Sequence, residues 1–297
     1  KALELRPNNP EAHNNLGNAL QKQGDLNAAI DSYEKALELR PNYPEAHNNL
    51  GNALQKQGNL NAAIASYKAA LQLKPNNPEV QNNLGIAFKE KGDFNAAIAS
   101  YNAALQLNSN YPEAQYNLGN AFKEKGDLNA AITSYNAALK LKPSYLQAHN
   151  NLGIALKEKG DLSAAIASYN AALQLKSNYP EAHYNLGIVL AEQGDFNAAI
   201  ASFEKAINLK KDLAISKAAL MHCQAKVCDW STYSRNCQWL ETLGIEGEAV
   251  APWGLLALED EPEKHLIRAQ RYYEKEYLRT ELTIYTSPKL RIRIGYF

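Results

Sequence analysis

The sequence has few cysteines, no excess of either charge and no long apolar run, and each absence excludes a class of protein. Only three of its 297 residues are cysteines, all after residue 222, which excludes a disulfide framework and favours a reducing cytoplasm. Lys and Arg total 31, as do Asp and Glu, so the chain lacks the excess of basic residues that is typical of proteins that bind nucleic acids. No apolar run approaches the roughly 18 residues of a membrane helix, and we see no secretion signal. We therefore expect a cytoplasmic protein with no nucleic-acid partner and no membrane partner.

What the sequence does contain is a repeat. The string Asn-Leu-Gly recurs every 34 residues, at 15–17, 49–51, 83–85, 117–119, 151–153 and 185–187. Six full units begin near residues 10, 44, 78, 112, 146 and 180, and together cover 10–213. Residues 1–9 match the end of such a unit, which predicts a further repeat before Lys1. A fixed period of this length indicates a stacked repeat architecture.

Each unit is predicted to form two helices, here called helix A and helix B. In the first unit, Pro10 suits the first position of helix A, and Gly24 suits a left-handed cap at its end. Asp25 is then expected to cap helix B, which ends at Pro41. Small residues such as Gly17 and Ala29 would let the two helices approach closely.

With positions counted 1–34 in each unit, Leu at 7, Gly at 8, Ala at 20, Tyr or Phe at 24 and Ala at 27 hold in all six. This pattern resembles the tetratricopeptide-repeat (TPR) family over residues 1–213. The usual Trp at position 4 is His or Gln here. The resemblance implies an all-α fold, a right-handed TPR superhelix (α-solenoid), with helix A lining the concave face. Such arrays bind proteins or extended peptides.

Asparagine is concentrated at two adjacent positions of helix A. Position 6 is Asn in every unit: Asn15, Asn49, Asn83, Asn117, Asn151 and Asn185. Position 5 is Asn in four units, namely Asn14, Asn48, Asn82 and Asn150, and Tyr in the other two. Asn costs roughly 0.6 kcal/mol against Ala at each interior helix site, so a compensating gain is expected.

A row of carboxamides can hydrogen-bond the amides of an extended polypeptide without reading its side chains. We therefore predict that these asparagines bind peptide backbone. The alternatives are that they bridge neighbouring helices, or that they reflect only tandem duplication of the unit. TPR domains that grip a free C-terminal carboxylate use Lys or Arg at positions 5 and 9, and neither occurs there in this chain.

The histidines and cysteines do not form a recognisable metal site. His13, His47, His149 and His183 follow the repeat and would lie too far apart to share an ion. The cysteines at 223, 228 and 237 lack the paired spacing of zinc sites. We expect no metal and no cofactor in this chain.

The repeat pattern fails after residue 212. Residues 214–230 are predicted to form a capping half repeat, and residues 231–289 a linker with an acidic loop and a helix beginning at Pro262. Residues 290–297 alternate apolar and basic side chains, which predicts a strand that begins a missing catalytic region.

Val-Cys-Asp-Trp-Ser-Thr-Tyr at 227–233 and Leu-Arg-Ile-Arg-Ile-Gly-Tyr at 290–296 resemble the O-linked N-acetylglucosamine (O-GlcNAc) transferase family. In that family, the first stretch follows the last TPR and the second opens the catalytic region. The resemblance implies a glycosyltransferase parent that transfers GlcNAc from UDP-GlcNAc to Ser or Thr. This chain would be the substrate-recognition arm of that parent. It would hold no catalytic residue and would not itself be an enzyme.

The alternative function is a stand-alone TPR scaffold, or adaptor, that assembles proteins without chemistry. The repeats alone do not distinguish the two, because fold does not fix function. A homodimer is compatible with either.

Overall fold

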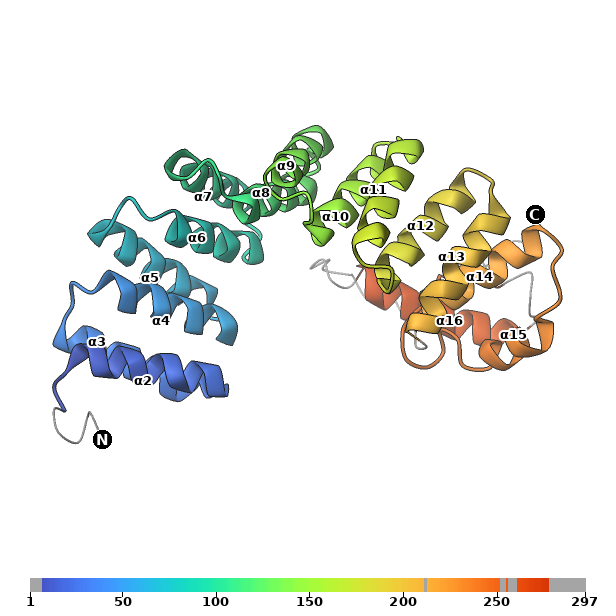
Figure 1. Ribbon diagram of the computed structural model, residues 1–297. Coiled ribbons are helices and arrows are strands. Elements are labelled where there is room, and N and C mark those ends of the chain that lie inside the picture. Colours follow the sequence, from blue (N-terminus) through green and yellow to red (C-terminus); the bar gives the residue numbers. More distant parts are fainter. Residues whose placement is uncertain (1–6, 211–212, 252–254, 256–260, 278–297) are drawn as a thin grey trace, which may run out of the picture. The chain divides into compact units, whose positions relative to one another are not determined.

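The computed structural model describes residues 7–210, 213–251, 255 and 261–277, and Figure 1 shows a chain of paired helices. Over these residues the structure contains fifteen helices and no strand, which confirms the predicted all-α fold. The strand predicted at 290–297 lies outside the described residues.

The chain divides into two compact units, residues 1–177 and 178–297. The first unit contains five helix pairs: α2 (Pro10–Gln23) with α3 (Leu26–Leu39), α4 (Pro44–Gln57) with α5 (Leu60–Leu73), α6 (Pro78–Glu90) with α7 (Phe94–Leu107), α8 (Pro112–Glu124) with α9 (Leu128–Leu141), and α10 (Leu146–Glu158) with α11 (Leu162–Leu175). Within this unit, each helix packs against its partner and against the next helix in the chain.

The second unit contains the sixth repeat and the segment that follows it. Its helices are α12 (Pro180–Glu192), α13 (Phe196–Leu209), α14 (Ala214–Lys226), α15 (Tyr233–Leu240) and α16 (Pro262–Tyr277). The helix predicted from Pro262 therefore begins where expected.

The helix ends follow the predicted chemistry. Pro10 is the first residue of α2, and Gly24 ends the helix with a φ of 90°. The Asp25 side chain then accepts a hydrogen bond of 3.1 Å from the backbone N–H of Ala28. Five of the six helix B segments begin with the same Asp cap, and α5 begins with Asn59. Each stop and cap fixes the turn between helix A and helix B.

Within each repeat, the two helices meet where the glycine at position 8 faces the aromatic ring at position 24. A methyl group added at Gly119 would lie 2.6 Å from the ring of Tyr135, and the other five repeats give 2.5 or 2.6 Å. Any side chain larger than hydrogen would therefore push the helices apart. Every position-24 ring is at most 1% exposed, so this contact forms the centre of each pair.

Where position 9 is Asn, the hydroxyl of the tyrosine at position 24 donates a hydrogen bond to that asparagine. Tyr33 donates to Asn18, Tyr67 to Asn52 and Tyr135 to Asn120, at 2.7–2.8 Å. The third repeat has Ile86 at position 9, and there the buried hydroxyl of Tyr101 has no partner. The sixth repeat has Ile188 together with Phe203, a pair in which no hydroxyl needs a partner.

In the second unit, α16 is joined to the end of α15 by a buried arginine. Arg268 is 0% exposed. Its Nε donates to the carbonyl oxygen of Leu243 at 2.8 Å, and its Nη2 donates to that of Leu240 at 2.6 Å. Leu240 is the last residue of α15 and Leu243 follows it, so the guanidinium supplies donors that the end of the helix lacks. Arg271 makes similar but more exposed bonds to Ile245 and Gly247.

We predict that Tyr101→Phe will leave stability unchanged or raise it by about 1 kcal/mol, because it removes a buried hydroxyl that has no partner. Tyr135→Phe is the matched control, because its hydroxyl is bonded, and it should lower stability by about 1 kcal/mol. Urea denaturation followed by circular dichroism would measure both. Equal losses in the two variants would contradict this account of the position 9 and position 24 pair.

We predict that Arg268→Met will destabilise the second unit by roughly 2–4 kcal/mol, because two charge-assisted hydrogen bonds are lost from a buried site. Arg271→Met should cost less, because that side chain is more exposed. All three tryptophans, at 230, 239 and 253, lie in the second unit, so tryptophan fluorescence during thermal melting reports its unfolding selectively. A smaller loss for Arg268→Met than for Arg271→Met would refute the role of Arg268.

Candidate functional site

The position-6 asparagines of the first unit hydrogen-bond across the seams between repeats. Asn49 donates from Nδ2 to Oδ1 of Asn14 at 3.0 Å, and Asn117 does the same to Asn82 at 3.0 Å. In the fifth repeat, Asn151 donates to the hydroxyl of Tyr116, which stands at position 5, at 3.0 Å. Consecutive A helices are thus connected by side chains that lie 35 residues apart in the sequence, in neighbouring repeats. The bridging role that the sequence left open is therefore present in the structure.

Two of these asparagines also reach position 9 of the preceding repeat. Asn83 donates to Asn48 at 3.3 Å and to Asn52 at 3.4 Å. Asn151 donates to Asn120 at 2.9 Å. Because the same oxygens accept from the position-24 tyrosines, the seam and the interior of the repeat share one polar network.

The position-5 asparagines lie deeper than those at position 6. Asn14, Asn82 and Asn150 are only 5–6% exposed, and Asn48 is half-buried. The position-6 side chains are half-buried in repeats two to six, and Asn15 in the first repeat is exposed. The structure therefore places the two groups of candidates in different layers, with position 6 nearer to solvent.

The bridging bonds leave part of each position-6 carboxamide without a protein partner. Among the described residues, Oδ1 of Asn49, Asn83 and Asn117 accepts no hydrogen bond. Asn49 and Asn117 also use only one of their two N–H donors there. Oδ1 of Asn151 differs, because it accepts from Asn150 at 3.3 Å. Three successive repeats thus present acceptors whose orientation is already fixed.

Sequence reasoning did not find the role of position 9. Asn18, Asn52 and Asn120 each accept from the tyrosine fifteen residues later. The available signal was the joint change in the sixth repeat, where Ile188 and Phe203 replace Asn and Tyr together. Burial raises the pKa of Tyr33 to about 12 and raises the pKa of Tyr67 and Tyr135 further. These hydroxyls therefore remain protonated donors at neutral pH.

The repeat histidines hold the loops between repeats. Nε2 of His13, His47 and His149 lies 2.8–3.0 Å from the backbone oxygen of the proline six residues earlier, which accepts the bond. Among the described residues, no group of three or more His, Cys, Asp or Glu side chains could hold a metal ion. Cys223 is buried, and burial raises the pKa of its thiol to about 11, so the thiol stays protonated.

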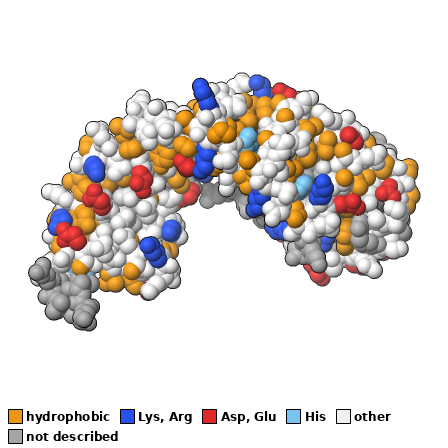
Figure 2. All heavy atoms as spheres, in the orientation of Figure 1, with side chains coloured by type: hydrophobic (Ala, Val, Ile, Leu, Met, Phe, Trp, Pro, Cys, Tyr) orange, Lys and Arg blue, Asp and Glu red, His pale blue; other side chains and the backbone are white. Residues whose placement is uncertain are grey.

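The face in Figure 2 shows Lys and Arg side chains interspersed with Asp and Glu rather than gathered in one patch. None of the helices in the described part of the chain combines the length and the apolar character that a membrane crossing requires.

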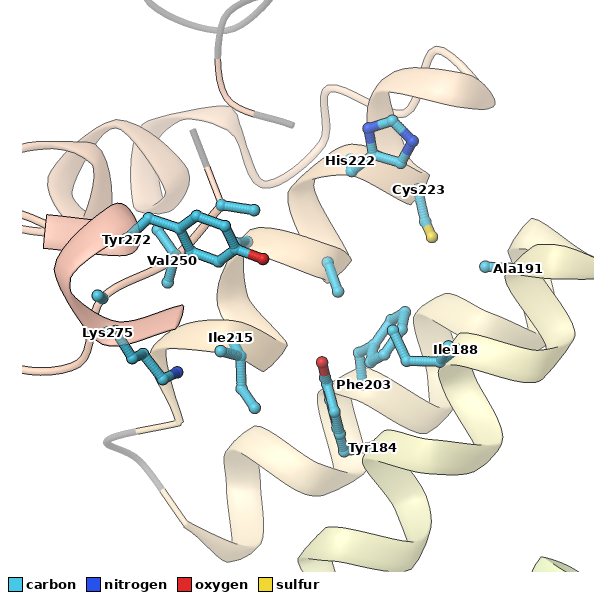
Figure 3. Close-up of a pocket in the computed structure, with 14 residues that line it drawn as sticks. Tyr184, Ile188, Ala191, Phe203, Ile215, His222, Cys223, Val250, Tyr272 and Lys275 are labelled. Carbon is cyan, nitrogen blue, oxygen red and sulfur yellow. The ribbon is translucent and has the colours of Figure 1, made fainter. Parts of the chain in front are cut away.

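The second unit contains an apolar pocket, shown in Figure 3, between α12, α14 and α16. Its volume is about 460 Å³. Its lining includes Tyr184, Ile188, Phe203, Ile215 and Tyr272. This pocket was not predictable from the sequence, because its walls come from the sixth repeat, the helix after it and α16.

Several solved structures are similar to this chain. The MamA protein is 29% identical, with a TM-score of 0.53 over 57% of this chain and 92% of that one. YrrB, described as a TPR protein with an unusual peptide-binding site, is 22% identical, with a TM-score of 0.53 over 63% and 96% of the two chains. PilF of Pseudomonas aeruginosa is 20% identical, with a TM-score of 0.61 over 73% and 97%. The last two show the fold alone.

A comparison with curated proteins finds no match. Sequence profiles for the repeat itself do match, and they cover the first 213 residues. The TPR repeat profile matches residues 1–24, 21–58, 56–92, 87–126, 119–160 and 155–194, and the tetratricopeptide repeat profile matches 180–213. Together with the helix pairs and their glycine–aromatic contacts, these matches show that the chain belongs to the tetratricopeptide-repeat family.

Proposed function

We propose that the position-6 asparagines bind the backbone of an extended polypeptide. TPR arrays serve protein–protein interaction, and the proposal specifies the surface that makes the contact here. The observation that carries it is the set of Oδ1 atoms on Asn49, Asn83 and Asn117 that accept no bond among the described residues. These oxygens can accept backbone N–H groups, and the spare N–H of Asn49 and Asn117 can donate to backbone carbonyls.

The position-5 asparagines act in this proposal as orienting groups. Asn14 and Asn82 are buried and hold Nδ2 of Asn49 and Asn117 in place. A side chain that is held before the ligand arrives loses less rotamer freedom on binding. The bridging role and the binding role are therefore compatible, because they use different atoms of the same carboxamide.

The spacing of the row suits an extended chain. Packed helices lie about 8–10 Å apart, and an extended polypeptide rises about 3.3 Å per residue. A peptide lying along the row would therefore meet one asparagine about every three residues. Binding through backbone groups would select extended polypeptides with little regard to sequence.

We predict that replacing Asn49, Asn83 and Asn117 together with Ala will weaken binding of an extended peptide. Three lost hydrogen bonds amount to roughly 1.5–4.5 kcal/mol, a factor of about ten to two thousand in affinity. The variant should lose at most about 3 kcal/mol of stability, because the better helix propensity of Ala offsets much of the loss of the seam hydrogen bonds. Fluorescence anisotropy with a labelled Ser/Ala peptide, read well below the melting temperature, would measure the affinity.

The matched control replaces Asn95, Asn102 and Asn136 with Ala. These asparagines are exposed on α7 and α9, both B helices, so their loss should not change the affinity. A folded Asn49/Asn83/Asn117 variant that binds the peptide as tightly as the original chain would rule out the asparagine row as the contact.

A narrower hypothesis, the substrate-recognition arm of an O-GlcNAc transferase-like enzyme, rests on the resemblance of residues 227–233 and 290–296. The family matches end at residue 213, and residues 290–296 lie outside the described residues. A TPR scaffold or adaptor accounts equally well for the array.

We predict that this chain will show no affinity for UDP-GlcNAc and no sugar transfer, because TPR arrays bind partners and the sequence contains no nucleotide-binding motif. Calorimetric titration with UDP-GlcNAc would test this, and micromolar binding would contradict it. Assay of the complete gene product for GlcNAc transfer would separate the recognition arm from the scaffold. The cytoplasmic location, the absence of a nucleic-acid partner and a homodimer remain predictions.

A further inference from the structure

The apolar pocket of the second unit arises where the asparagine pattern is lost. In the capping helix α14, positions 5 and 6 are Ala218 and Ala219, where the repeats have Asn or Tyr at position 5 and Asn at position 6. The two alanines line the pocket, and their small side chains leave the space unfilled. The loss of larger polar side chains at these two positions thus contributes to the pocket.

The same change leaves the hydroxyl of Tyr184 without its usual donor. In the fourth repeat, Tyr116 stands at the equivalent position and accepts a hydrogen bond from Asn151. The residue equivalent to Asn151 beside Tyr184 is Ala219, which has no side-chain donor. Among the described residues, the Tyr184 hydroxyl makes no hydrogen bond, and Figure 3 shows it pointing into the pocket.

The rest of the lining is apolar apart from His222, Cys223 and two side chains of α16. Ile188, Phe203, Ile215 and Val250 supply aliphatic and aromatic surface. Tyr272 and Lys275 of α16 face the same space in Figure 3. A volume of about 460 Å³ with this lining is typical of pockets that bury an apolar group and orient it with a few polar contacts.

We propose that this pocket is a specificity site that buries one large apolar side chain, aromatic or branched, of a bound extended polypeptide. The Tyr184 hydroxyl donates to a backbone carbonyl beside that side chain. The inference rests on the proposed backbone binding, and it adds a sequence preference to a surface that otherwise ignores sequence.

A polypeptide is the occupant because the pocket and the asparagine row share a helix. Asn185, the position-6 residue of α12, follows Tyr184 directly and precedes Ile188 by one helical turn. Residues three apart lie on the same face of a helix, so a chain in contact with Asn185 also passes Ile188, which lines the pocket. A free small molecule could fill the pocket without that contact.

The test compares two fluorescein-labelled 14-residue peptides, one of alternating Ser and Ala and one identical except for a central Phe. The Phe peptide should bind the chain at least tenfold more tightly, because a buried aromatic side chain contributes at least that much. Ala191→Phe places a ring into the pocket from α12 and should abolish the difference between the peptides. The matched control, Ala201→Phe on the exposed side of α13, should preserve it.

A second variant guards against a folding defect in Ala191→Phe. Tyr184→Phe removes only a hydroxyl and should weaken the Phe peptide about two- to tenfold. Tryptophan fluorescence melts would establish that the second unit is folded in each variant. The pocket proposal would be overturned if Tyr184→Phe bound the Phe peptide with unchanged affinity and folded Ala191→Phe still preferred the Phe peptide over the Ser/Ala peptide.

The outcomes separate the two proposals. If both peptides bind equally, the pocket is overturned and the asparagine row stands. If the Ser/Ala peptide fails to bind, the backbone proposal is overturned, and N-acetylphenylalaninamide then tests the pocket alone by ligand-observed NMR. A signal lost in Ala191→Phe and kept in Ala201→Phe would support the pocket, and no signal in the original chain would overturn it.

Discussion

The contact between the glycine at position 8 and the aromatic ring at position 24 determines what each repeat can build. The ring occupies the space that a Cβ atom at position 8 would need, so the two helices can approach this closely only because position 8 is glycine. This approach brings position 9 of helix A within hydrogen-bond reach of the tyrosine hydroxyl. It also sets the face of helix A that meets the preceding repeat. The polar network at the seams therefore depends on an apolar contact inside the repeat.

The network explains why asparagine is retained at sites where it disfavours the helix. A carboxamide at position 6 loses about 0.6 kcal/mol of helix propensity against Ala, and a hydrogen bond across the seam returns about 0.5–1.5 kcal/mol. The two terms nearly cancel, so bridging alone removes the cost without adding much stability. The remaining acceptor on Asn49, Asn83 and Asn117 is then available for a ligand at no further conformational cost.

Much of the fold could be predicted from the sequence because its signals are local. Pro10, Gly24 and Asp25 act on their own turns, and the structure has helix ends at these residues. Because the sequence repeats every 34 residues, a correct prediction for one unit applies to all six. The division at residue 177 was not predictable, because the repeat pattern continues through it without a change.

The candidate site was predicted only in part, for a related reason. The sequence showed that Asn15 to Asn185 recur on one stripe, but it treated positions 5 and 6 alike. Only packing shows that Asn14, Asn82 and Asn150 are buried while position 6 lies nearer to solvent. The Tyr101 hydroxyl without a partner and the pocket beside Tyr184 were also missed, because each arises from a single substitution whose effect appears on the neighbouring helix.

Loss of asparagine has two outcomes in this chain, and the difference between them depends on where the freed hydroxyl lies. Ile86 removes the acceptor beside Tyr101 deep within a helix pair, where no ligand can replace it, so the unpaired hydroxyl only costs stability. Ala219 removes the donor beside Tyr184, whose hydroxyl faces a pocket and can itself donate to a ligand carbonyl. The same kind of substitution thus produces a defect in one repeat and a candidate recognition site at the end of the array.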